Sequence, residues 1–86
     1  MDGNARETIV GVAIEFCGSV WTLPQPNRHH DVIRDRVERT GLRGSGRQGF
    51  VTSAGRFVDR AIAADIAYAA GQIAEPRVRL FSEDLW

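Results

Sequence analysis

The strongest constraint on the fold is a pair of β-branched, apolar runs near the start of the chain. The first run covers residues 8–16 (TIVGVAIEF) and the second covers residues 19–23 (SVWTL). Two such runs joined by a two-residue link that contains glycine are typical of a β-hairpin. Two prolines follow closely, and proline cannot donate a hydrogen bond to a strand ladder. We therefore expect a hairpin whose second strand ends at residue 23.

The next segment has the pattern of an amphipathic helix. Asn27 is a suitable N-cap, and Gly41 is placed to end a helix that runs to about residue 40. At 100° per residue, one side of this helix carries the charged residues and the other side is mainly apolar. The residues expected on the apolar side are His29, Ile33, Val37 and Thr40. One histidine is thus expected in the apolar stripe, either as a core residue or as the wall of a pocket.

A second hairpin and a final strand complete the expected fold. Residues 49–53 and 56–58 flank a turn, and residues 77–81 form a last short strand. Residues 82–86 form a terminal turn whose apolar side chains dock onto the body. The order ββ-α-ββ-α-β is typical of an α+β fold with an antiparallel sheet and two helices. At this length we expect one small domain, residues 1–86.

The second helix is unusual because it is apolar nearly all round. Asp59 is its expected N-cap, and Gly71 is expected to close it after about Ala70. We expect Ile62, Ile66 and Ala69 to face the core, with small apolar residues and Tyr68 on the far side. A helix of this kind is buried on two sides or seals an interface. The thin core of a short chain favours the interface, and hence a homo-oligomer.

The charges are concentrated in the middle of a neutral chain. All eleven basic residues are Arg, and there is no Lys, which excludes a Schiff-base lysine and a Walker-type lysine. Residues 28–60 hold eight Arg against four acids, a local charge of +4, whereas each flank carries −2. A GC-rich genome would explain the number of Arg residues. Their placement favours an anionic ligand, because the local field attracts ligands more than the net charge does.

Few residues support catalysis or metal binding. His29 and His30 are adjacent, so they point about 100° apart on a helix and cannot share one ion. The single Cys17 allows no internal disulfide, and no serine has a nucleophile-elbow context. No apolar run approaches the ~20 residues of a membrane span, and residues 1–4 do not resemble a secretory leader. We expect a cytoplasmic protein that is not an enzyme, with no catalytic residues, cofactor, metal or membrane association.

The loop Arg43-Gly44-Ser45-Gly46-Arg47 is a first candidate for anion binding. Successive backbone N–H groups in a Gly-rich turn can form a concave anion site. The loop follows a helix rather than a strand and lacks the P-loop pattern, so this signal is weak. The alternatives are a lid over a ligand and a linker with two solvated arginines.

The segment 48–60 (QGFVTSAGRFVDR) is the densest candidate, because two Phe and two Arg alternate around its turn. Phe50 or Phe57 offers a face on which a base can stack. Arg56 or Arg60 offers a fork that can hold phosphate oxygens. The alternative is that both Phe lie in the core and both Arg pair with nearby acids.

Three stretches together resemble a family of small phage proteins, the Thoeris anti-defence sponges. They are residues 26–33 (PNRHHDVI), residues 49–60 (GFVTSAGRFVDR), which are the most specific part, and residues 80–86 (LFSEDLW). The resemblance covers most of the chain from about residue 8. It implies a phage-encoded protein, in the cytoplasm of the infected bacterium, that binds a cyclic ADP-ribose signal of bacterial TIR-domain sensors without cleaving it. It also implies dimers or hexamers and, in some members, a separate site for cyclic oligonucleotides.

The resemblance also implies roles for individual residues. Phe50 would stack on adenine, and Arg28 and Arg77 would bind the diphosphate. Asp59 stands where the family pattern leads us to expect an Asn-type contact, and an acid there suits a ribose hydroxyl or a helix cap. With Arg56 from the hairpin, these residues form the expected ligand site. Two other functions fit the residues: an Arg-rich nucleic-acid-binding module, disfavoured by the near-neutral pI of 6.7, and a non-catalytic oligomeric interaction subunit.

Overall fold

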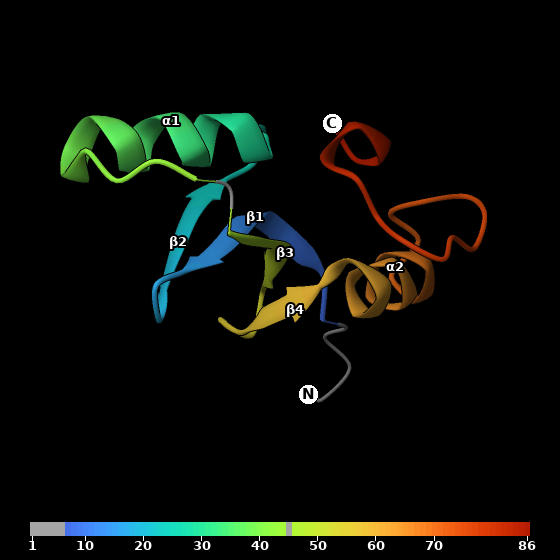
Figure 1. Cartoon of the computed structure of the whole chain (residues 1–86). Helices are drawn as coiled ribbons and strands as arrows, with labels where there is room; N and C mark the ends of the chain where they lie inside the picture. The colour runs from blue at the N-terminus through green and yellow to red at the C-terminus, as the bar shows by residue number, and fades with distance from the viewer. Residues whose placement is uncertain (1–6, 45) are drawn as a thin grey trace.

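The computed structural model describes residues 7–44 and 46–86, so the expectations for residues 1–4 and for Ser45 lie outside the described residues. It shows a small α+β domain with one four-stranded antiparallel sheet of order β2-β1-β3-β4, with two helices (Figure 1). The predicted fold class is therefore confirmed. In chain order the elements are β1 (Ile9–Phe16), β2 (Ser19–Pro24), α1 (His29–Thr40), β3 (Arg47–Thr52), β4 (Phe57–Asp59), α2 (Arg60–Ala69) and a short 3-10 helix, η1 (Ser82–Asp84).

The first hairpin forms as the sequence predicts. Its turn residues Cys17 and Gly18 both have positive φ, 52° and 79°, as the favoured two-residue hairpin turns require. The register places Val12 opposite Leu23 and Ile14 opposite Trp21. One face of the hairpin is therefore apolar, and its side chains pack in or against the hydrophobic core.

The core lies between this face of the sheet and both helices. Val12 pairs with Phe50 and Phe50 with Val58, so the three side chains share one face across β1, β3 and β4. The same core cluster contains Val32 from α1 and Ala63 from α2. In Figure 1, α1 lies beside β1 and β2, whereas α2 follows directly from β4 at the other side of the sheet. This arrangement places the beginning of β3 and the end of β4 next to the start of α2.

The start and the rotation of α1 differ from the prediction. Arg28, not Asn27, occupies the N-cap position, and the Asp31 carboxylate accepts a hydrogen bond from the Arg28 N–H. The Asn27 side chain is engaged in the preceding turn, where it donates to the Pro24 carbonyl. Gly41 ends the helix with a φ of 74°, as predicted. The buried residues of α1 are His29, Val32 and Arg36, so the helix is rotated from the predicted stripe and buries an arginine.

The packing of α2 differs in part from the prediction. Asp59 caps the helix by accepting from the Ile62 N–H at 2.9 Å, as expected. Its buried side consists of Ala63, Ala64 and Ala67, however, and Ile62, which was expected to face the core, is 46% exposed. Ile66 packs against the core and Tyr68 is exposed, both as predicted. Small alanines allow the helix backbone to approach the sheet closely, and this decides which of two apolar sides is buried.

The predicted final strand does not form. Residues 77–81 are irregular, and the Leu80 N–H donates to the Arg60 carbonyl at 3.0 Å rather than to a strand. The chain is held here by side chains instead, since Leu80 is fully buried. The end of the chain docks as predicted, because the Trp86 indole N–H donates to the Asn27 carbonyl at 2.7 Å.

Candidate functional site

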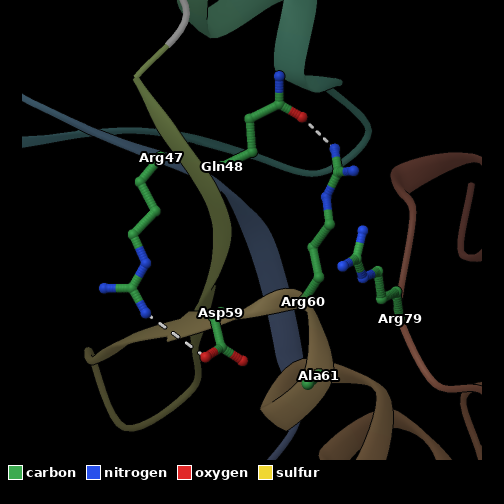
Figure 2. A pocket seen from close by; sticks show the side chains of 6 residues that line it. All are labelled: Arg47, Gln48, Asp59, Arg60, Ala61 and Arg79. Atoms are coloured by element: carbon green, nitrogen blue, oxygen red, sulfur yellow. Dashed lines mark hydrogen bonds and ion pairs between the residues drawn. The ribbon is translucent and has the colours of Figure 1, made fainter.

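A pocket opens at the end of the sheet where β3 begins, β4 ends and α2 starts. Its volume is about 290 Å³, near the lower limit for small-molecule sites. Figure 2 shows its lining side chains, which come from β3, β4, α2 and the C-terminal segment. The lining residues are Arg47, Gln48, Asp59, Arg60, Ala61 and Arg79. We call this the end pocket; its three guanidinium groups and one carboxylate give it a formal charge of +2.

Arg60 is the most constrained of the three arginines. Its guanidinium donates to the Gln48 side-chain oxygen and lies over the Phe81 ring, with its Cζ 4.5 Å from the ring centroid. Its Nε is buried and has no hydrogen-bond partner. Burial lowers the pKa of Arg60, the nearby Glu83 opposes this, and the Arg79 charge lowers it further. Arg60 therefore lies between one acidic and one basic neighbour, with its buried Nε donor unused.

Arg47 and Asp59 form the other side of the end pocket. Their side chains approach to 3.4 Å, and Arg47 also lies 3.7 Å from Glu15. Both contacts are long, and the Arg47 side chain is more than half exposed. Exposed ion pairs of this kind contribute little free energy. Arg47 can therefore exchange a carboxylate for a ligand phosphate at small cost.

The start of α2 adds a partial positive charge to the end pocket. Ala61 lines the pocket from the first turn of the helix. The Asp59 Oδ1 satisfies one backbone N–H of this turn, and its other oxygen faces Arg47. Helix N-termini favour anions because the peptide dipoles align. The geometry thus suits a phosphate group, with Asp59 as an acceptor for a neighbouring hydroxyl.

Phe50 is removed from the candidate site. Its ring is fully buried, with 0% exposure, and packs edge-on against His29 with ring centroids 4.9 Å apart. A base cannot stack on a ring that has no open face. The alternative interpretation, a core phenylalanine, is the one that its position supports.

His29 does not line the end pocket but holds the backbone of β3 next to it. Its Nε2 lies 2.7 Å from the Gly49 carbonyl, and burial lowers the pKa of this histidine. A neutral ring with its proton on Nε2 donates to that carbonyl. Gly49 pairs with Asp59 in the ladder, so the histidine fixes the backbone that carries the pocket. His29 is thus a core residue behind a pocket wall.

The other predicted ligand arginines lie apart from the end pocket. Arg28 donates to the Trp86 carbonyl oxygen at 2.7 Å, so it holds the C-terminal turn. Arg56 forms a two-bond ion pair with Glu7 at 2.7 and 2.8 Å, beyond the turn between β3 and β4. Asp59 alone of the five predicted site residues lines the end pocket.

Arg77 lines a second pocket of about 390 Å³. Its Nε is 3.6 Å from an Asp84 oxygen. Glu75 also lines this pocket, so its one arginine faces two acids. The charge is therefore less suited to a phosphate than that of the end pocket.

Sequence reasoning nominated Arg60 as an alternative and missed Arg47 and Arg79 as ligands. The sequence places Arg47 only at the end of the Gly-rich loop, where it carries no predicted role of its own. Arg79 lies 19 positions beyond Arg60, and nothing local connects the two. Arg79 lies beside α2 because its neighbour Leu80 is buried against the body, and only the folded structure shows this.

The described residues hold no cluster suited to a metal ion. Within residues 7–44 and 46–86, no three His, Cys, Asp or Glu side chains are grouped so that they could bind one. Over the same residues, no helix is long and apolar enough to cross a membrane.

Comparison with protein-family models assigns the chain to a family. The family described as "Phage T4 y16D protein" matches residues 8–86. The chain belongs to this family. It is thus a phage protein, and the match includes every residue of the end pocket. No match was found among curated proteins or among solved structures.

Proposed function

We propose that this phage protein binds and sequesters a small anionic nucleotide signal of the cyclic ADP-ribose type, without cleaving it, and so blocks a bacterial anti-phage defence. The observation that carries the proposal is the convergence of Arg47, Arg60 and Arg79 on one pocket with a single carboxylate. Arginine forks bind phosphate oxygens through two parallel hydrogen bonds. Membership of a phage family supports a role in the cytoplasm of the infected host.

The parts of the ligand have distinct places in this proposal. The diphosphate lies between Arg60 and Arg79, which both line the pocket and can each bind phosphate oxygens. Asp59 accepts a hydrogen bond from a ribose hydroxyl. The pocket of about 290 Å³ holds the phosphate part, and the base lies outside it against Phe81, which contacts Arg60 and is 41% exposed. Phe81 thus takes the stacking role first expected of Phe50.

Oligomerisation is the second part of the proposal. The outer side of α2 exposes Ile62 and Tyr68, and burial of this side between copies of the chain gives a dimer or a hexamer. Light scattering of the wild type and of Ile62→Glu measures the mass in solution. A monomeric wild type would exclude the oligomer and leave the ligand site standing.

Calorimetric titration with cyclic ADP-ribose isomers tests the ligand site. Arg79→Gln is the sharpest variant because Arg79 is exposed and its loss leaves the core intact. A hydrogen bond to a charged group contributes about 1.5–3 kcal/mol, so affinity should fall roughly 10- to 100-fold. Arg77→Gln is the matched control and should bind as the wild type does. If only Arg77→Gln loses affinity, the site is the second pocket instead.

Heating the loaded protein tests sequestration. Chromatography of the released material should show intact ligand, whereas a cleaved product would make the protein an enzyme. The same preparation distinguishes the nucleic-acid-binding alternative, which predicts binding to long DNA or RNA that weakens steeply with salt. Retention of long nucleic acid without binding of any cyclic nucleotide would overturn the proposal.

A further inference from the structure

Arg36 is a buried arginine that the proposed function does not use. Its side chain is fully buried, with 0% exposure, in the C-terminal half of α1. The guanidinium lies over the Phe16 ring, with its Cζ 4.0 Å from the ring centroid. Its Nε makes one long hydrogen bond, 3.4 Å, to the Leu42 carbonyl, and both terminal nitrogens, Nη1 and Nη2, are buried without a partner.

No carboxylate of the described residues neutralises Arg36. On the same helix, Asp31 pairs with Arg34 at 2.7 Å and Asp35 pairs with Arg39 at 3.0 Å. Both pairs lie on the outer side of α1. A buried guanidinium with two unused nitrogens is costly, because its donors have lost water and gained no acceptor. An acceptor that reaches Nη1 and Nη2 would therefore remove this cost, which favours its binding.

The segment Gly41–Gly44 covers this guanidinium. All four residues are exposed, and Leu42 provides the single carbonyl that Arg36 reaches. Gly44 has a φ of 124°, and a Cβ at this position would lie 3.0 Å from the Phe16 ring, so the backbone passes close over the ring. A segment with few buried contacts and exposed backbone opens at low cost.

We propose that Arg36 and the Phe16 ring form a second, covered binding site for a compact oxyanion, either free phosphate or a terminal phosphate group. The ring holds the guanidinium plane, and Nη1 and Nη2 present two parallel donors to two oxygens of the anion. The structure shows the covered form. The anion enters when residues 42–44 move away from Phe16. This site is separate from the end pocket, and it does not depend on the proposed function.

Titration with inorganic phosphate, followed by NMR of the full chain, tests the proposal. The Arg79→Gln background is used so that the end pocket responds less. We expect the Arg36 Nε–H signal and the Gly44 amide signal to shift together and to saturate. Unmoved signals would overturn the proposal, as would contacts from the Arg36 protons to a bound water that phosphate does not displace. Methyl phosphate identifies the source: a shared response means that a terminal phosphate group enters, and a phosphate-only response means that the site takes the free ion.

A matched pair of variants gives an independent measurement. Arg36→Met keeps the buried volume and removes the charge, whereas Arg39→Met removes an exposed arginine of the same helix. Phosphate should raise the urea midpoint of Arg39→Met and leave that of Arg36→Met unchanged, with both in the Arg79→Gln background. An equal rise in the two variants would overturn the proposal. If Arg36→Met does not fold, the NMR titration still decides the question.

Discussion

The guanidinium of Arg60 lies over the Phe81 ring, with 4.5 Å between its Cζ and the ring centroid. Next to this contact, the Leu80 N–H donates to the Arg60 carbonyl. The start of α2 and the C-terminal segment are therefore joined twice within a few residues. The same contacts place Arg79 beside the end pocket, so the irregular end of the chain supplies part of the candidate site.

Phe81→Leu should loosen this junction. The variant keeps an apolar side chain and removes the ring face, so the cation–π contribution of about 0.5–2 kcal/mol is lost from the free energy of unfolding. Ligand affinity should fall as well, because Arg60 loses the surface that orients it. Urea denaturation and calorimetry measure the two effects. Val78→Ala is the control, since Val78 is 86% exposed and should change stability by less than about 0.5 kcal/mol.

Gly49→Ala should destabilise the domain strongly. A Cβ at position 49 would lie 2.3 Å from the Val58 carbonyl oxygen and 2.6 Å from the Phe57 ring, inside the β3–β4 pair. Backbone and ring would have to move apart, and we expect a loss of about 3 kcal/mol in the free energy of unfolding, at the upper end of what core overpacking produces. Gly41→Ala is the matched control, because a Cβ at that site would meet no other atom. The substitution should lower the free energy of unfolding by only the cost of holding an alanine at positive φ, about 1–2 kcal/mol. Equal losses in the two variants would contradict this explanation.

The four strands of the sheet could be predicted from the sequence because their signals are local, whereas residues 77–81, which were expected as a fifth strand, are irregular. Alternating β-branched residues and a Gly-containing turn define the first hairpin, and Asp59 caps the second helix as expected. The orientation of α2 could not be predicted in the same way. When both sides of a helix are apolar, hydrophobicity no longer distinguishes them, and the close fit of Ala63 against the sheet decides.

The candidate site was predictable only in part, because it is assembled from distant segments. Asp59 and Arg60 were both noted within one hairpin segment. Arg79 joins them through the docking of Leu80, which is a tertiary event. Phe50 was misassigned because a phenylalanine in a strand carries the same pattern whether its face points to a ligand or to the core. Only the sheet register, with Phe50 opposite Val12, resolves this.

Acid should destabilise the protein through His29. Burial lowers the pKa of this histidine below its ordinary value of 6.5. Below pH 6.5 the unfolded chain therefore binds a proton that the folded chain does not, so the free energy of unfolding falls, by at most about 1.4 kcal/mol per pH unit. Urea titrations between pH 8 and pH 5 (roughly the range in which histidines titrate) measure this slope. His29→Gln should flatten it, and the control His30→Gln, at an exposed site, should not.

A second acid-sensitive contact, between Glu7 and Arg56, should act at lower pH. The two-bond contact with Arg56, aided by Thr52, lowers the pKa of Glu7 from 4.5 to about 2. The folded state then releases this proton more readily than the unfolded state, so the stabilisation is complete above pH 4.5 and is lost as the pH falls towards 2. Glu7→Gln and Arg56→Gln should each reduce the loss of stability in this window, and their double variant should reduce it no further. The carboxyl carbon signal of Glu7, followed by NMR, gives its titration directly. A midpoint near 4.5 in the folded protein would show that the ion pair does not persist in solution.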